Sequence, residues 1–279
     1  MNEKKGKKGL LLTIIFSIIS VIYIAPIIII LYNSFKKKAY IAKSPFSLPN
    51  EQTFSGFENY TSGINKTSFL SSFGYSLFIT VGSVFLILLC TSMCAWYITR
   101  SKSKFSKCLY FLFVFSMIVP FQMVMFTLSK TADFLKLTNP VGIIIVYLGF
   151  GAGLAVFMFS GFVKAVPLEI EEAALIDGCS PLQTFFMIVL PILKPTAISV
   201  GILETMWIWN DYLLPYLVLN IKKYKTIPIA IQYLKGGYGS IDIGAMMAML
   251  VLAIIPIIVF YISLQKYIIK GVAAGAVKG

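Results

Sequence analysis

The chain has 279 residues, of which 58% are hydrophobic and 13% are charged, and its formal net charge is +13 at pH 7. This composition is too apolar for a soluble domain of that length and predicts an all-α polytopic membrane protein. The lysines and arginines are scattered through loops between apolar segments and form no basic stripe, so they indicate contact with a lipid bilayer and no binding of nucleic acid.

Six apolar segments reach the length of roughly 20 residues that a helix needs to cross the hydrocarbon of a bilayer. In chain order they are residues 9–32, 75–97, 108–128, 142–162, 196–219 and 244–264. The third and fifth are interrupted by prolines and polar residues, among them Pro120, Asn210, Asp211 and Pro215. The sequence therefore predicts a six-span transmembrane domain over residues 9–264, with both termini on one side of the membrane.

The orientation is predicted from the excess of lysine and arginine in cytoplasmic loops. Four lysines precede the first span, and four basic residues lie within 100–107 after the second span. These charges place residues 1–8 and the tail 265–279 in the cytoplasm, together with the polar loop 166–195. The lysine triplet 36–38, just beyond the first span, opposes this orientation and is interpreted as a solvated charge run.

The loop between the fourth and fifth spans is expected to start with a short helix. Pro167 suits the first helical position. The carboxylates of Glu169, Glu171 and Glu172 lie in the opening turns, where the helix dipole favours negative charge. Gly178 can adopt the positive φ that ends a helix.

A second helix is expected to follow the glycine. Ser180 is a good N-cap, Pro181 follows it, and Gln183 stands three residues after the serine, which is the spacing of a capping box. Pro191 and Pro195 are expected to end this helix. A compact helical hairpin between two spans suits a docking surface, and the alternative is an ordinary amphipathic loop.

Several kinds of chemistry have no residues to support them in this sequence. The chain contains no histidine, which is the commonest general base and metal ligand. It contains no phosphate-binding loop of the Gly-x-x-x-x-Gly-Lys-Ser/Thr type, so ATP is not expected to bind by that route. The four cysteines have no metal-type spacing and are interpreted as apolar fillers. We expect no enzyme, no metal and no cofactor on this chain, and any energy must come from a partner or an ion gradient.

The fifth span carries the residues that could line a translocation path. An ion-coupled carrier would bury several ionisable groups, whereas only Glu204 and Asp211 qualify here. Trp209, Asn210 and Tyr212 offer the aromatic surface and amide groups that suit a sugar. The alternative is that Asn210 and Asp211 hold a broken helix together by pairing with freed backbone groups.

Several motifs resemble those of the membrane-spanning permease subunits of bacterial ABC importers. Glu172-Ala173-Ala174, Gly178 and the stretch Ile188-Val189-Leu190-Pro191 match the loop by which such permeases dock on their ATPase. A narrower similarity, to the second permease of the maltose, lactose and multiple-sugar type, rests on three further stretches: residues 46–49 with 58–60, residues 209–215, and residues 265–267 running to 275–279. The resemblance covers nearly the whole chain and departs from the family at Cys179, where alanine is usual.

The resemblance implies a role for each residue of the docking loop. Glu172 would face a basic residue of the ATPase, Ala173 and Ala174 would allow close approach, and Gly178 would set the angle between the two helices. Asp177, Leu190 and Pro191 complete the matched pattern. Gly275 and Lys278 belong to a tail that would reach the ATPase subunits, although a frayed end is an equally acceptable interpretation.

The resemblance also implies the partners and the function. This chain would pair with a second, different permease in the bacterial plasma membrane and form half of a translocation path for a sugar or oligosaccharide. Two cytoplasmic ATPase subunits would hydrolyse ATP, and an extracytoplasmic sugar-binding protein would deliver the substrate. Since the family's sugar contacts come mainly from the other permease, the structural interpretation of Asn210 and Asp211 is favoured. A permease for a non-sugar solute, an ion-coupled carrier and a membrane scaffold are the alternatives.

Overall fold

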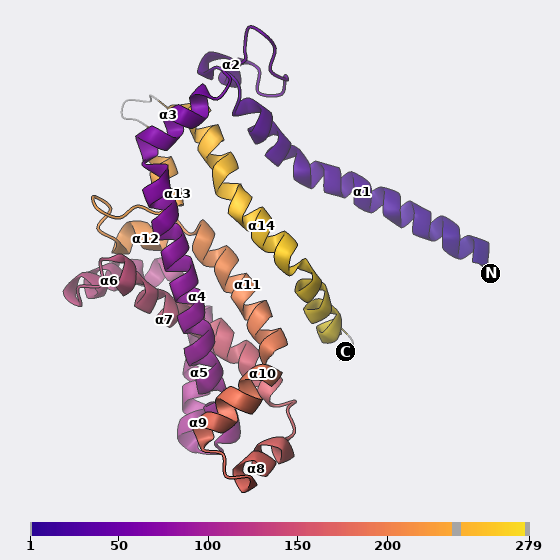
Figure 1. The fold of residues 1–279 in the computed structure, drawn as a ribbon, viewed down its shortest axis with the longest axis vertical. Helices are drawn as coiled ribbons and strands as arrows, with labels where there is room; N and C mark the ends of the chain where they lie inside the picture. The colour runs from indigo at the N-terminus through magenta and orange to yellow at the C-terminus, as the bar shows by residue number, and fades with distance from the viewer. Residues whose placement is uncertain (1, 236–240, 277–279) are drawn as a thin grey trace. The chain divides into compact units, whose positions relative to one another are not determined.

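The structure is a computed structural model that describes residues 2–235 and 241–276 (Figure 1). Helices dominate these residues, and within them the only β-type pairings are two isolated bridges, Lys36 with Phe54 and Lys235 with Ile241. The predicted all-α class is confirmed. The chain divides into two compact units, the first comprising Met1–Leu70 and Ala230–Pro256 and the second comprising Ser71–Ile229 and Ile257–Gly279.

The first unit is built on two long helices. It contains α1 (Asn2–Asn33), α2 (Lys38–Lys43), α3 (Glu58–Thr67), the end of α13 (Ile227–Gln232) and the first part of α14 (Ile243–Ala276). Stretches of α1 and α14 are long and apolar enough to cross a bilayer, which agrees with the predicted first and sixth spans. The apolar side chains of α1 are exposed along most of its length, as expected for a helix whose surroundings are lipid or protein partners.

Asn59 organises the loops of the first unit. Its side-chain amide donates hydrogen bonds to the carbonyl oxygens of Ser34 and Lys36, each at 2.8 Å. Helix α3 also approaches α14 closely, because a Cβ added at Gly63 would lie 2.7 Å from the terminal methyl of Met249. Near the same contact, Lys66 on α3 forms an ion pair with Asp242, the residue before α14, with 2.5 Å between Nζ and Oδ2.

Lys36 corrects one expectation from the sequence. The lysine triplet was predicted to be solvated, yet the Lys36 side chain is fully buried in the first unit. Its ammonium donates to the carbonyl oxygen of Ser44 at 2.8 Å and to the hydroxyl of Ser47 at 3.2 Å, and it lies 5.3 Å from the centre of the Tyr32 ring. Burial lowers the pKa of this lysine. The chain folds back after α2 and supplies the acceptors that make burial of the charge tolerable.

The second unit contains the remaining helices. In chain order they are α4 (Phe69–Arg100), α5 (Lys104–Ile118), α6 (Phe121–Phe134), α7 (Pro140–Val163), α8 (Leu168–Ile176), α9 (Pro181–Thr184), the π-helical turn η1 (Phe185–Val189), α10 (Leu190–Ile192), α11 (Lys194–Asn210) and α12 (Leu213–Val218). Helices α4 and α7 agree with the predicted second and fourth spans.

Helix α7 lies at the centre of the second unit. Its side chains Ile143, Tyr147 and Phe159 are fully buried in the apolar core, to which α4 and α11 also contribute. Helix α5 packs closely on α7, because a Cβ added at Gly153 would lie 2.8 Å from the carbonyl oxygen of Phe113. Small residues at such contacts let helix backbones approach each other, which is a common means of association in membranes.

The third and fifth predicted spans are broken, as their prolines and polar residues suggested. Helices α5 and α6 meet at a bend of 108° around Val119 and Pro120. Within the predicted fifth span 196–219, α11 ends at Asn210 and a separate α12 follows, so the break falls at the polar residues that the sequence indicated. A second bend, of 75°, separates Pro181–Ile192 from α11. Within residues 2–235 and 241–276, four helices are long and apolar enough to cross a bilayer, and the number of spans rises to as many as six when each bent pair counts as one span.

Candidate functional site

The first arm of the predicted hairpin is α8. Pro167 stands at its N-cap, with φ −57° and ψ 134°, and not at the first helical position as predicted. Glu169 and Glu171 lie in the first turn. The helix ends in a Schellman motif, in which Gly178 adopts φ +86° and donates to the carbonyl oxygen of Leu175, while the Cys179 amide donates to that of Ala174. The predicted glycine turn is confirmed.

The second arm begins with the predicted capping box. The Ser180 hydroxyl accepts from the amide of Gln183, and the Gln183 side chain accepts from the amide of Ser180 at 2.8 Å. The prediction that Pro191 ends this helix is wrong, because Pro191 lies inside α10 directly after the π-helical turn. A wider turn accommodates a residue without an amide hydrogen. Pro195 stands at the start of α11, beyond the bend.

Adjacent glutamates in α8 have different environments. Glu171 is buried, and its Oε1 accepts from Nε and Nη2 of Arg100 at 2.9 and 2.7 Å, while its Oε2 accepts from the indole of Trp96 at 2.9 Å. Glu172 is exposed, as is Ala173, whereas Ala174 is buried against the rest of the unit. One carboxylate thus holds the hairpin on α4, and the next faces outward.

The outer face of the hairpin is apolar for a loop between spans. Seven large apolar side chains of the two arms are exposed, and the four most exposed are Leu175 (52%), Ile176 (86%), Leu182 (59%) and Met187 (69%). Asp177 and Pro191 are also exposed, and Leu190 is half-buried. Exposed apolar residues gathered beside charged ones are typical of protein–protein contact surfaces.

The break after α11 is stabilised by Asp211. Its Oδ1 accepts from the backbone amides of Leu213 at 2.9 Å and Leu214 at 3.3 Å, and its Oδ2 accepts from the buried hydroxyl of Tyr147 at 3.0 Å. The carboxylate therefore caps α12 and fastens it to α7. Freed backbone groups in a broken membrane helix need such partners.

The other residues predicted for a translocation path are divided between two environments. Glu204 (2% exposed) and Trp209 are buried, and the Trp209 ring packs edge-on against Phe73 with centroids 5.8 Å apart. Asn210 is exposed and donates to the carbonyl oxygen of Met206 at 2.7 Å. Tyr212 is half-buried and stacks on Tyr216 at 5.2 Å. The structure brings Asn210 and Tyr212 to the surface of the break and keeps Glu204 and Trp209 inside.

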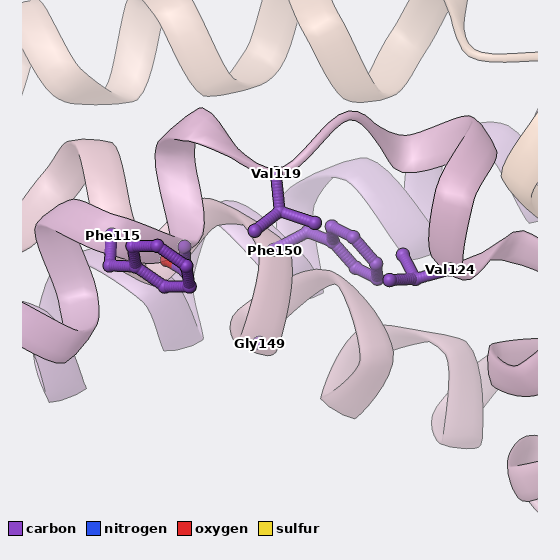
Figure 2. Close-up of a pocket in the computed structure, with 6 residues that line it drawn as sticks. Phe115, Val119, Val124, Gly149 and Phe150 are labelled. Atoms are coloured by element: carbon purple, nitrogen blue, oxygen red, sulfur yellow. The ribbon is translucent and has the colours of Figure 1, made fainter.

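A hollow of about 270 Å³ lies at the bend between α5 and α6. Figure 2 shows the apolar side chains that line it, including Phe115, Val119, Val124 and Phe150. The only side-chain hydroxyl on its wall, that of Ser116, donates to a backbone carbonyl of its own helix. A sugar needs several convergent polar groups, so this hollow does not have the lining of a sugar site.

The C-terminal tail was predicted to contact a partner or to fray. The backbone is helical through Ala276, so Gly275 lies in the last turn of α14. Lys278 lies outside the described residues.

Arg100, Trp96 and Tyr147 are the residues that the sequence interpretation missed. Arg100 and Trp96 lie on the last two turns of α4, and Tyr147 lies in the middle of α7. Lys and Arg at the end of a span are normally attributed to the membrane boundary, so Arg100 gave no separate signal. A tyrosine hydroxyl in the middle of an apolar span must have a buried partner, and that signal was available for Tyr147.

Comparison with known proteins identifies relatives over nearly the full chain. A probable starch degradation products transport system permease protein of Thermoanaerobacterium thermosulfurigenes is 38% identical over 269 residues, covering 96% of both chains. The permease protein of a multiple sugar-binding transport system in Streptococcus mutans is 33% identical over 95% of both chains. A melibiose/raffinose/stachyose import permease protein of Bacillus subtilis is 30% identical over the whole of both.

A solved structure supports the same fold. A bacterial ABC transporter involved in the import of the acidic polysaccharide alginate contains a chain that is 21% identical to this one, with a TM-score of 0.75 over 93% of this chain and 95% of the other. Residues 87–274, which include the hairpin and both bends around α11, match the family of binding-protein-dependent transport system inner membrane components. The chain therefore belongs to that family of ABC importer permeases.

Proposed function

We propose that this chain takes up a sugar or oligosaccharide, as one of two permease subunits in a binding-protein-dependent ABC importer of the bacterial plasma membrane. The sugar class is supported by its relatives, which are named for starch degradation products, multiple sugars and raffinose-type oligosaccharides. The chain contains no phosphate-binding loop of the Gly-x-x-x-x-Gly-Lys-Ser/Thr type, so we assign the supply of energy to cytoplasmic ATPase subunits.

The hairpin α8–α10 is the surface that docks on the ATPase. The observation that carries this assignment is its outer face, on which Glu172 stands among exposed apolar side chains of both arms, including Ile176 and Met187. The Schellman motif and the capping box fix the angle between the arms without help from a partner, so little ordering is needed on docking.

The orientation in the membrane follows from docking of the hairpin on a cytoplasmic ATPase, and the other partners complete the importer. Docking on a cytoplasmic ATPase requires residues 166–195 to be cytoplasmic, and an even number of spans then places both termini there. A second permease completes the translocation path, and an extracytoplasmic sugar-binding protein delivers the substrate. The tail 275–279, with Gly275 and Lys278, reaches toward the ATPase; deleting it should lower transport-coupled ATP hydrolysis, and unchanged hydrolysis would show that it is only a chain end.

At the break between α11 and α12 we assign a structural role to Asp211, which holds the break in place. We assign Asn210 and Tyr212 to the surface of the translocation path. The Asp211 carboxylate accepts three hydrogen bonds within the chain, from two backbone amides and from Tyr147. Asn210 is exposed beside this capped break and lies nearer to any solute. Asn210→Ala should leave substrate preference unchanged if the sugar is bound mainly by the other permease, and an altered preference would reverse that assignment.

The proposal is tested by isolating the tagged chain from its native membrane in mild detergent and identifying its stoichiometric companions. We expect an ATPase and a second permease. Glu172→Lys should lower ATPase retention about tenfold or more, because reversing a charge within a docked interface costs several kcal/mol. Gly178→Pro should do the same, because proline cannot adopt φ +86° and lacks the amide that donates to Leu175.

The matched control is Asp133→Lys, an equal charge reversal at an exposed position on α6, which should leave retention unchanged. Normal uptake by both hairpin variants would refute docking through this surface. Recovery of the chain alone, with uptake that survives ATP depletion but stops with a protonophore, would replace the importer with an ion-coupled carrier.

A further inference from the structure

The last turns of α4 contact both arms of the hairpin. Arg100 binds the first arm, through Glu171 and through a hydrogen bond from Nη2 to the carbonyl oxygen of Val166 at 2.9 Å. Trp96 binds both arms, since its indole donates to Glu171 and its ring packs against Phe185 of the second arm with centroids 5.6 Å apart. One helix end thus fixes the positions of both arms.

The contact is built to resist movement between the hairpin and α4. Both oxygens of the Glu171 carboxylate are occupied, and Nη2 of Arg100 is shared between that carboxylate and the Val166 carbonyl. Glu171, Val166 and Phe185 are buried, with exposed fractions of 4%, 6% and 0%. Arg100 and Trp96 are half-buried. Charge-assisted hydrogen bonds are shorter and stronger than neutral ones, and two donors from one guanidinium fix its direction as well as its distance.

The other side of the contact is formed by the long helix α4. Helix α4 is one helix of 32 residues from Phe69 to Arg100, and it contains no proline. A displacement of its last turn is therefore transmitted along the helix and not absorbed at a kink. The neighbouring α5 and α11 each adjoin a bend, of 108° and 75°, whereas α4 is one unbroken helix.

We propose that Arg100, Trp96 and Glu171 form a rigid joint that delivers movement of the docked hairpin to α4. This inference rests on the proposed function of the hairpin as the ATPase-docking surface. The three are positioning residues: they touch neither the ATPase nor the sugar, and their role is to prevent the hairpin from moving without α4. Losing the joint should leave docking intact and separate ATP hydrolysis from transport.

The test uses the complete importer, with its ATPase, second permease and binding protein, reconstituted in proteoliposomes. Two quantities are measured, the amount of ATPase retained on the permease and the number of sugar molecules transported per ATP hydrolysed. Arg100→Lys keeps the charge but loses the fork of donors. Trp96→Phe keeps a ring against Phe185 but loses the donor to Glu171.

Both variants should retain the ATPase to within about twofold and lower the transport ratio about fivefold or more, the range over which residues along a coupling path act. The double variant should transport no worse than the poorer single variant, because both substitutions disable one joint. Lys102→Gln removes an exposed positive charge two residues beyond Arg100 and should change neither quantity.

Two results would overturn the joint. A normal transport ratio in Arg100→Lys and Trp96→Phe would show that the hairpin does not need this contact to drive α4. Alternatively, the variants could retain less ATPase while the number of sugar molecules transported per ATP hydrolysed stays normal. That result would mean that the contact only shapes the hairpin for docking. Failure of the unmodified chain to retain any ATPase would instead refute the proposed function, and with it the joint.

Discussion

Replacing Asp211 with alanine should destabilise the protein by removing three hydrogen bonds at the end of α11. The carboxylate accepts from the amides of Leu213 and Leu214 and from the hydroxyl of Tyr147. Leu214 and Tyr147 are buried, with exposed fractions of 1% and 0%, so water cannot easily replace the lost acceptor. Alanine has no atom that can accept in its place.

The size of the effect can be estimated from these contacts. Removing a side chain that caps the start of a helix costs about 0.5–2 kcal/mol. Leaving the buried Tyr147 hydroxyl without its acceptor costs about 1–3 kcal/mol more. The sum is roughly 1.5–5 kcal/mol, which corresponds to a fall of roughly 3–20 °C in the midpoint of thermal unfolding, at about 2–4 °C per kcal/mol for a large domain.

The measurement is the thermal midpoint of the detergent-purified protein, with two further variants as controls. Asp211→Asn keeps the capping oxygen and should cost less than about 1 kcal/mol. Tyr147→Phe removes the hydroxyl together with its need for an acceptor, so the double variant Asp211→Ala with Tyr147→Phe should cost less than the sum of the two single variants. An unchanged midpoint in Asp211→Ala, accompanied by lost transport, would refute the structural role and place Asp211 in the translocation path.

Three further substitutions test the backbone, the buried carboxyl and the ion pair of the first unit. Gly178→Ala should lower the stability by about 1–2 kcal/mol, because an alanine is strained at φ +86°. Crowding adds nothing to this cost, since no described atom lies within 4 Å of the added Cβ. The control is Gly161→Ala, at an equally open position within a helix, which should not lower the stability. Glu204→Gln should raise the midpoint of thermal unfolding. In the part of the chain that the structure describes, the buried Glu204 Oε2 has no hydrogen-bond partner, and an unpaired carboxylate in a span is costly. A lower midpoint would show that the charge has a partner. Burial raises the pKa of Asp242, but hydrogen bonds from Lys66 Nζ and the Ala245 amide outweigh it and hold the pKa below its ordinary value. The pairing therefore stabilises the fold fully above the unfolded pKa of about 3.9, and this contribution is lost as the pH falls through the lower folded pKa. Asp242→Asn should lower the midpoint slightly at pH 7 and by less at pH 3, and equal differences at both would refute the ion pair's contribution.

The hairpin could be predicted in detail because its signals are local. The capping box of Ser180 and Gln183 and the positive φ of Gly178 depend on residues within a few positions of each other. The same sequence could not predict that Glu171 is buried and Glu172 exposed, because Arg100, which binds Glu171, lies 71 residues earlier in the chain. Two adjacent glutamates on a helix differ only in the direction of their side chains, and that direction acquires meaning when α8 lies against α4.

Lys36 and Pro191 were predicted wrongly for a related reason. Lysine is almost always exposed, and only the return of the chain at Ser44 and Ser47 provides the oxygens that bury Lys36. Proline usually ends a helix, but the π-helical turn before Pro191 removes the conflict between its ring and the preceding turn. In both cases, the usual preference of the residue was overridden by a neighbouring segment whose conformation the sequence pattern did not reveal.

The two broken spans differ in how the start of the following helix is satisfied. At Pro120 the proline has no amide hydrogen of its own, and no side chain caps the start of α6. At Asp211 the break exposes amides that a bilayer cannot satisfy, and the chain maintains a carboxylate and a buried tyrosine to bind them. Keeping Asp211 therefore stabilises one particular geometry of the break, in which Asn210 and Tyr212 reach the surface beside it.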